Sequence, residues 1–326
     1  MERLEITLCG IELRNPVLAA SGTFGYGLEF ASLIDLNRIG GFVTKGISAQ
    51  PIAGNPPPRL WETAAGMMNS VGLQNVGVRA FVRDKLPQLR RFRTAVFANV
   101  FGYAQSDYAE VIRVLEDAEG VSGYELNVSC PNTHAGGIFF SSEPDQLSEL
   151  VRSVRHLTRR PLIVKLSPNV SRIQPMAVAA AEAGADAISL VNTFIALAID
   201  ARARRPRLGA GFGGLSGPAI KPIALRMVYE AVQAVRVPVI GLGGIRTGED
   251  AAEFLIAGAS AVQVGTMNFA DPRAPLRIAR ELDKFLVSER VASVRDLVGS
   301  LQMNEANRKH APGAESDRPV LPSRRS

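Results

Sequence analysis

Residues Gly123–Asn132 read GYELNVSCPN, an apolar run that ends in polar residues and a proline. Short aliphatic or β-branched runs of this kind are typical of strands that are buried on both faces of a parallel sheet. The chain carries seven more, each ending in Gly, Asn, Ser, Thr or Lys: Pro16–Gly22, Gly41–Gly46, Ala95–Gly102, Pro161–Ser167, Ala187–Thr193, Pro238–Gly244 and Ala261–Thr266. The sequence therefore predicts eight strands.

Segments with helical spacing lie between these runs, and several end in glycine as helix C-termini often do. They include Ser106–Asp117, Pro144–Leu157, Arg172–Gly184, Ala219–Val235 and Thr247–Gly258. Eight strand–helix units over about 290 residues match a (β/α)₈ TIM barrel. A doubly wound sheet is the alternative, but polar residues and glycines fall at the strand ends, where a barrel builds its active site: Lys45, Asn99, Asn127, Lys165, Asn192, Gly243, Gly244 and Gly265.

Three stretches lie outside the repeat. Leu4–Leu13 alternates apolar and polar residues and predicts an N-terminal hairpin that closes the barrel bottom. Residues 47–75 are rich in proline and predict a long irregular loop insertion after the second strand. After Leu301 the composition shifts to Asn, Arg, Pro and Ser, so we expect a barrel domain over 1–301 and a disordered tail over 302–326.

The composition of the 326 residues is that of a globular protein, with 46% hydrophobic and 21% charged residues. The net charge of +6 comes without a basic run interleaved with aromatic residues, which argues against nucleic-acid binding. The first residues lack the features of a signal peptide, and no apolar run approaches the roughly 18 residues of a membrane span. These features predict a cytoplasmic protein.

Cysteine and histidine are scarce. Two cysteines, Cys9 and Cys130, exclude a disulfide scaffold, and an iron–sulfur cluster in this chain would need about four. Three scattered histidines give no metal-ligand spacing, so we expect no metal. Cys130 follows its strand directly and stands among polar residues, whereas no Asp or Glu nearby could orient a histidine as in a Cys/His hydrolase. A thiol that accepts a proton fits this setting.

Glycine-rich stretches near the last strands indicate a phosphorylated ligand, because barrels bind phosphate there through backbone N–H groups. They are Gly213–Pro218, Gly241–Gly244 and Val264–Thr266. Residues 241–246 read GLGGIR, which does not fit a dinucleotide-binding fingerprint. Lys45 and Lys165 end apolar strands and need an anionic partner, which can be a phosphate, a carboxylate or an electron-rich ring. A Schiff-base lysine of an aldolase is the alternative.

Four motifs together resemble the class 1 dihydroorotate dehydrogenases, in order from about residue 3 to 300. They are NVSCPN at Asn127–Asn132, MNSVGLQN at Met68–Asn75, GLSGPAIKP at Gly214–Pro222 and GLGGI at Gly241–Ile245. The resemblance implies an FMN-dependent barrel that oxidises dihydroorotate to orotate in pyrimidine synthesis. It also implies that Cys130 is the base that removes the C5 proton while hydride leaves C6 for the flavin.

The same resemblance implies two sets of binding residues. Those expected to hold the substrate are Lys45, Asn69, Ser70, Val71, Gly72, Leu73, Asn127, Asn192 and Thr193. Those expected to contact FMN are Ser21, Lys45, Gly46, Asn99, Asn127, Lys165, Val191 and Gly217, with Gly243, Gly244, Gly265 and Thr266 around its phosphate. Positive charge from the two lysines would stabilise the reduced flavin.

Within class 1, the stretches Asn132–Ile138, Met67–Asn69 and Ser167–Asn169 resemble the NAD-linked subclass. That resemblance implies an electron-transfer partner subunit with FAD and a [2Fe–2S] cluster, and a homodimer core within a heterotetramer. Fumarate or quinone as acceptor, or another pyrimidine as substrate, are the redox alternatives. A phosphate-binding lyase or aldolase that uses Lys165 is the non-redox alternative.

Overall fold

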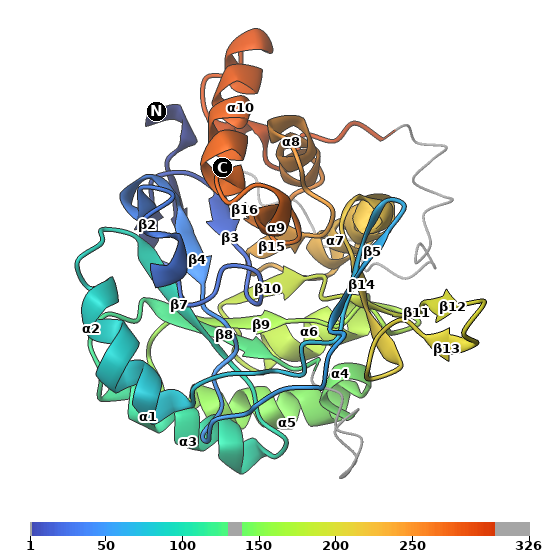
Figure 1. Cartoon of the computed structure of the whole chain (residues 1–326). Coiled ribbons are helices and arrows are strands. Elements are labelled where there is room, and N and C mark those ends of the chain that lie inside the picture. The colour runs from blue at the N-terminus through green and yellow to red at the C-terminus, as the bar shows by residue number, and fades with distance from the viewer. Residues whose placement is uncertain (1, 130–138, 304–326) are drawn as a thin grey trace.

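The computed structural model describes residues 2–129 and 139–303 and contains the predicted closed barrel of eight parallel strands (Figure 1). In barrel order the strands are β3 (Val17–Ala19), β4 (Gly41–Val43), β7 (Ala95–Val100), β8 (Gly123–Asn127), β9 (Leu162–Lys165), β10 (Ala187–Leu190), β15 (Val239–Leu242) and β16 (Ala261–Val264). Each strand falls within a run predicted from the sequence.

Closure of the barrel depends on the pairing of its last and first strands. β16 runs parallel to β3 with Val262 opposite Val17, so the sheet has no free edge. Nearly all strand residues are buried, which is why the runs are apolar throughout rather than alternating. β8 ends at Asn127, five residues before the predicted end, because the Asn127 Oδ1 accepts the Ser129 N–H in a side-chain turn.

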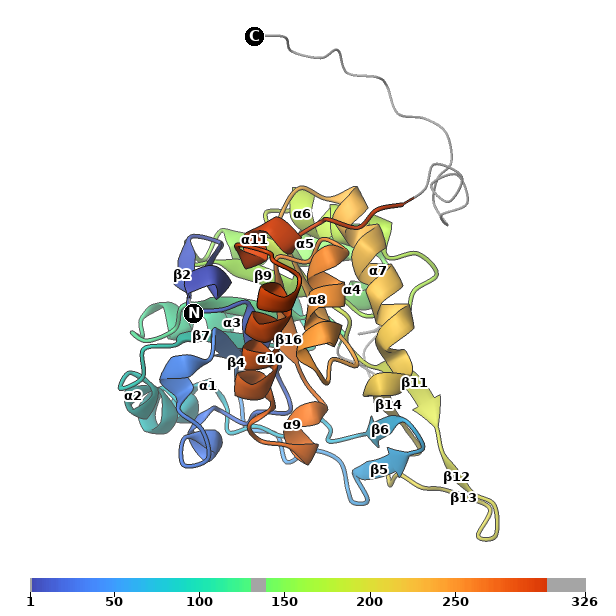
Figure 2. The ribbon, with the colours of Figure 1, turned by 90° about the horizontal axis from the view of Figure 1, so that it is seen from above.

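The helices lie outside the strands (Figures 1 and 2). The five predicted helices are present as α3 (Gln105–Glu116), α5 (Pro144–Arg155), α6 (Gln174–Glu182), α7 (Lys221–Ala234, after the 3₁₀ turn Pro218–Ile220) and α8 (Gly248–Ile256). Two further helical segments were not among the predicted helices. They are α10 (Ala274–Ser288) and residues 78–89, which contain α1 (Val78–Ala80), a π-helix (Phe81–Lys85) and α2 (Leu86–Leu89). Short helices complete the layer: α4 (Phe139–Ser142), α9 (Met267–Ala270) and α11 (Val294–Leu297).

The N-terminal hairpin is confirmed as β1 (Ile6–Leu8) and β2 (Ile11–Leu13). Its turn residues Cys9 and Gly10 both have positive φ. The Cys9 thiol donates to the carbonyl oxygen of Asp186, which precedes β10, at 3.4 Å, so the hairpin contacts the amino-terminal end of the barrel. Burial, with a smaller effect of Asp186, raises the pKa of this thiol to about 12.

The prediction of an irregular loop over 47–75 is wrong for its second half. Residues 60–69 form a hairpin of β5 (Leu60–Thr63) and β6 (Gly66–Asn69). It joins β14 (Phe212–Ser216) and β11 (Phe194–Leu197) in an antiparallel sheet of order β11-β14-β6-β5. The pairing partner of β6 lies far away in sequence, so local patterning could not reveal it. β12 (Ile199–Asp200) and β13 (Arg205–Pro206) extend away from the barrel (Figure 2).

Within residues 2–129 and 139–303, no helix is long and apolar enough to cross a membrane. The predicted tail 302–326 lies outside the described residues from 304 onward, so its disorder and the domain boundary at 301 remain predictions.

The start of α8 is held by the carboxylate of Asp250. Asp250 accepts the N–H groups of Arg246 and Thr247 at 2.8 and 3.0 Å and the Lys221 ammonium at 2.6 Å. Burial alone would raise the pKa of Asp250, but the Lys221 and Arg246 hydrogen bonds lower it below its usual value. The carboxylate therefore connects α7 to the first turn of α8.

We expect Asp250→Asn to lower the free energy of unfolding by about 1–3 kcal/mol near neutral pH, because it weakens these hydrogen bonds. Since the folded-state pKa is depressed, this contribution is present above the unfolded pKa of about 4 and is lost as pH falls through the folded value. Urea unfolding at neutral and acid pH should show the gap to the wild type narrowing in acid.

The matched control is Glu249→Gln, in the same helical turn, where the carboxylate is exposed and makes no hydrogen bond with any described residue. Its effect should stay within about 0.5 kcal/mol. Equal losses in the two variants would contradict the role given to Asp250.

Candidate active site at the carboxyl ends of the strands

The polar residues predicted at strand ends surround one mouth of the barrel. The strands run parallel in a closed sheet, so their carboxyl ends meet on one side. The residues that lie there are Ser21 after β3, Lys45 and Gly46 after β4, Asn99 in β7, Asn127 at the end of β8, Lys165 at the end of β9, Val191 to Thr193 after β10, Gly243 and Gly244 after β15, and Gly265 and Thr266 after β16. The residues predicted from the strand-end pattern and those implied by the family resemblance therefore lie around the same mouth, and their roles in binding stay predictions.

Three of the predicted substrate residues form one hydrogen-bonded group. The Asn192 amide nitrogen donates to Asn127 Oδ1 at 3.3 Å, and the Thr193 N–H donates to Asn192 Oδ1 at 2.9 Å. Tyr108 of α3 donates its hydroxyl to the Asn127 carbonyl at 2.9 Å from outside the barrel. The ends of β8 and β10 therefore present amides that are fixed in orientation.

The antiparallel sheet of β11, β14, β6 and β5 brings the insertion at residues 47–75 close to Thr193. Asn69 in β6 pairs with Gly214 in β14, and a Cβ on Gly214 would lie only 2.0 Å from Thr193 Oγ1. Asn69 is therefore one strand away from Thr193. The neighbouring segment Ser70 to Leu73 is half-buried, and both Gly72 and Leu73 adopt left-handed backbone, which is strained for leucine.

The pairing of β6 with β14 shows that the phosphate-binding prediction for Gly213–Pro218 is wrong for its first two residues. Gly213 and Gly214 lie in β14 and not in a phosphate-binding loop. Their lack of a side chain serves packing, because a Cβ at Gly213 would lie 2.3 Å from Leu208 and one at Gly214 would collide with Thr193. Gly217 follows β14 and lies close to Gly244.

Gly217, Gly244, Gly265 and Thr266 form a cradle beside the ends of β15 and β16. A Cβ on Gly244 would lie 3.0 Å from the Gly217 carbonyl oxygen, and one on Gly217 would lie 3.6 Å from Thr266 Cγ2. The N–H groups of Gly244, Gly265 and Thr266 donate no hydrogen bond to any residue that the structure describes. Adjacent backbone donors that are left without acceptors suit a bound phosphate.

Below the mouth, the barrel contains a buried carboxylate that the sequence analysis missed. Glu125 of β8 is fully buried and accepts hydrogen bonds from Asn99 Nδ2 (2.8 Å), Ser189 Oγ (3.0 Å) and Gln263 Nε2 (2.7 Å). The Lys165 ammonium lies 3.6 Å from Glu125 Oε1, with 7% of its side chain exposed. Of the anionic partners predicted for Lys165, a carboxylate is therefore the one that the structure contains. The sequence feature that could have revealed this carboxylate is the acidic residue Glu125 within an otherwise apolar strand.

Lys45 lies half-buried at the mouth with a cation nearby. Burial, and next the charge of Arg59 in the insertion, lower the pKa of Lys45, while Glu29 acts in the opposite direction. Arg59 is held by the carbonyl oxygens of Asn55 and Ala53 and by the Gln74 side chain. A half-buried lysine with a second cation nearby favours an anionic ligand, because an anion offsets both the burial and the repulsion.

Cys130 and the stretch Asn132–Ile138 lie outside the described residues, so the predicted base and one of the subclass motifs have no described geometry. Just before them, Ser129 Oγ is buried and has no hydrogen-bond partner among the residues that the structure describes. No cluster of three His, Cys, Asp or Glu residues that could hold a metal occurs in the described part of the chain.

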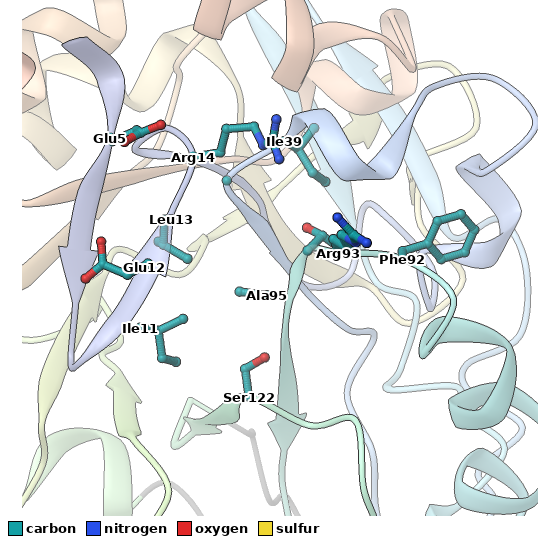
Figure 3. A pocket seen from close by; sticks show the side chains of 12 residues that line it. Glu5, Ile11, Glu12, Leu13, Arg14, Ile39, Phe92, Arg93, Ala95 and Ser122 are labelled. Atoms are coloured by element: carbon teal, nitrogen blue, oxygen red, sulfur yellow. The ribbon is translucent and has the colours of Figure 1, made fainter. Parts of the chain in front are cut away.

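A hollow of about 670 Å³ lies at the other end of the barrel, between the N-terminal hairpin and the residues that precede β4 and β7 (Figure 3). Arg14, Ile39 and Arg93 line it, together with Glu5 and Glu12. None of the predicted site residues is among its lining residues, so size alone does not make it the candidate site.

Comparison with known proteins connects this geometry to one family. The family model described as dihydroorotate dehydrogenase matches residues 3–286, which span the whole barrel. A Solibacter usitatus protein provisionally named dihydroorotate dehydrogenase A (fumarate) is 70% identical over 92% of this chain and 99% of its own length. Proteins of Citrifermentans bemidjiense and Geobacter metallireducens, named dihydroorotate dehydrogenase B (NAD(+)) catalytic subunit, are 52% and 53% identical over 92% of this chain and 98% of their own.

A substitution at Gly265 of the cradle can separate ligand binding from folding. Position 265 lies on the same side of β16 as the inward-facing Gln263, and a Cβ there would meet only the Ala20 Cβ at 3.7 Å. We therefore expect Gly265→Ala to unfold at the wild-type temperature but to bind FMN at least ten-fold more weakly, as measured by flavin titration of the apoprotein. Undiminished affinity would contradict a phosphate site at this position.

Proposed function

Because the chain belongs to the dihydroorotate dehydrogenase family, we propose that it oxidises dihydroorotate to orotate with FMN as its flavin. The observation that carries the proposal is the family match across the entire barrel. The residues of the four motifs that are described support it, since they gather around the carboxyl ends of the strands and the sheet beside them.

Membership of the family implies a flavin, and the residues present fit FMN. The cradle of Gly217, Gly244, Gly265 and Thr266 offers backbone donors for its phosphate. Buried polar atoms below and beside the mouth, Asn99 Oδ1 and Gln263 Oε1 among them, lack partners within the described structure and could accept from a ring N–H. Lys165 supplies a buried positive charge. A bound FMN would supply the acceptor for a hydride.

The substrate carries a carboxylate and a ring with amide groups, and the residues at the mouth match both. Lys45, with Arg59 behind it, provides positive charge for the carboxylate. Asn69, Asn127 and Asn192 provide amide donors and acceptors that recognise ring N–H and C=O groups. Their hydrogen bonds to neighbouring residues fix these amides before substrate binds, which lowers the entropic cost of positioning it.

Proton removal from C5 is assigned to Cys130 on the strength of the resemblance in its motif. An unperturbed thiol has a pKa of about 8.5, so only a few per cent is thiolate at neutral pH. The thiolate accepts the proton as hydride leaves C6, which leaves a double bond in orotate. Activity should therefore rise toward alkaline pH until the thiol is fully ionised.

For the electron acceptor, we propose NAD⁺ reached through a partner subunit that carries FAD and a [2Fe–2S] cluster. Several relatives at 52–53% identity are named catalytic subunits of NAD(+)-type enzymes. Two cysteines cannot ligate a cluster within this chain, so the partner would carry it. The proposed assembly is a homodimer of this chain with two partner subunits. Fumarate is the second candidate, because the 70% identical relative bears that name.

Substitution of the proposed base tests the chemistry. Cys130→Ala should slow reduction of the bound flavin by dihydroorotate at least 100-fold, since a general base contributes about 10² to 10⁴ in rate. FMN should stay bound, and Cys130→Ser should shift the pH dependence further to alkaline pH, because a hydroxyl ionises less readily than a thiol. Stopped-flow absorbance at several pH values measures both effects. A wild-type rate in Cys130→Ala would exclude this base.

Visible spectra of the purified protein test the reaction and the acceptor. A yellow protein that bleaches when dihydroorotate is added without oxygen supports the proposal. The reduced protein, alone and with its native partners, is then mixed with NAD⁺ or with fumarate. Reoxidation of the isolated chain by fumarate would favour the second candidate. A protein that takes up no FMN would favour a lyase that uses Lys165, and borohydride trapping of a Schiff base would detect that activity.

A further inference from the structure

The carboxylate of Glu125 decides how its neighbours face the mouth. An ionised carboxylate accepts hydrogen bonds and donates none, so the NH₂ groups of Asn99 and Gln263 must both turn toward it. Their carbonyl oxygens then turn away, and both are buried without a partner among the described residues. Asn99 Oδ1 lies 3.2 Å from the Cβ position of Gly46, which follows β4 at the mouth.

The same carboxylate sets the charge below the mouth. Glu125 is fully buried and lies 3.6 Å from the Lys165 ammonium, so its negative charge offsets that of the lysine with little screening by solvent. The described residues place no further carboxylate in hydrogen-bond or ion-pair contact with Lys165. Removal of the Glu125 charge would leave an uncompensated cation below the mouth.

We propose that Glu125 is a positioning residue that tunes the bound flavin: it turns the carbonyl oxygens of Asn99 and Gln263 toward the ring, and it offsets the charge of Lys165 and so limits the positive charge that the ring experiences. This inference rests on the proposed FMN site. Glu125 is fully buried and acts through Asn99, Gln263 and Lys165. A flavin gains negative charge on reduction, so a more positive surrounding stabilises its reduced form.

The experiment is a measurement of the FMN reduction potential in the purified holoprotein, for wild type and Glu125→Gln. Glu125→Gln keeps the shape of the side chain and removes its charge. We expect the oxidised–reduced equilibrium to move at least ten-fold toward reduced flavin, which is a rise of about 30 mV for a two-electron couple. The affinity of the apoprotein for FMN, measured by titration, should fall because the two amides lose their fixed orientation.

The matched control is Glu230→Gln. Glu230 is another buried carboxylate, on α7 outside the strands, and is paired with Arg226. Its loss removes the same charge and also costs stability, but it should leave the potential at the wild-type value. A potential that is unchanged in Glu125→Gln, or that moves equally in both variants, would overturn the inference.

If Glu125→Gln does not fold, Glu125→Asp tests the inference instead. This substitution retains the negative charge and shortens the side chain by one methylene group. It should keep the potential near the wild-type value but bind FMN at least ten-fold more weakly, and an unchanged affinity would overturn the inference. A wild-type protein that binds no FMN would overturn the proposed function and this inference together. A wild type that bleaches with dihydroorotate, beside variants that match it, would overturn this inference alone.

Discussion

The pairing of β16 with β3 closes the sheet, and every other feature of the site depends on that closure. Closure brings residues from the whole length of the chain, from Ser21 to Thr266, around one mouth. It also creates a solvent-inaccessible interior, in which four polar side chains, those of Asn99, Lys165, Ser189 and Gln263, surround the carboxylate of Glu125. A charge at this depth requires satisfied partners, and the barrel supplies them from β7, β9, β10 and β16.

The parallel strands of the barrel and the antiparallel sheet contribute different residues to the mouth. The parallel strands contribute fixed amides and backbone donors, such as those of Asn127 and Gly265. The antiparallel sheet of β5, β6, β11 and β14 brings Asn69 beside Thr193, and the insertion that contains it also carries Arg59, whose charge acts on Lys45. A rigid scaffold thus holds the general features of the site, while segments outside the repeat hold those that contact a particular substrate.

The sequence predicted the parts of this structure that depend on local pattern. Apolar runs such as Pro161–Ser167 revealed all eight strands, and their polar ends revealed the mouth. The β5–β6 hairpin was missed because its stability depends on β14, a partner that no local pattern indicates. Glu125 was missed for a related reason: its partners Asn99, Ser189 and Gln263 come from three other strands, so only the folded barrel shows why a carboxylate is tolerated there.

The antiparallel register between β6 and β14 also limits how this family can vary in length. Successive side chains of a strand point to opposite faces, so one residue inserted or deleted within the paired part of β6, Met67–Asn69, would turn part of this strand to the opposite face of the sheet. The tip between β12 and β13, which extends from the barrel, has no such constraint. Natural length variation should therefore accumulate at that tip and be rare within β6.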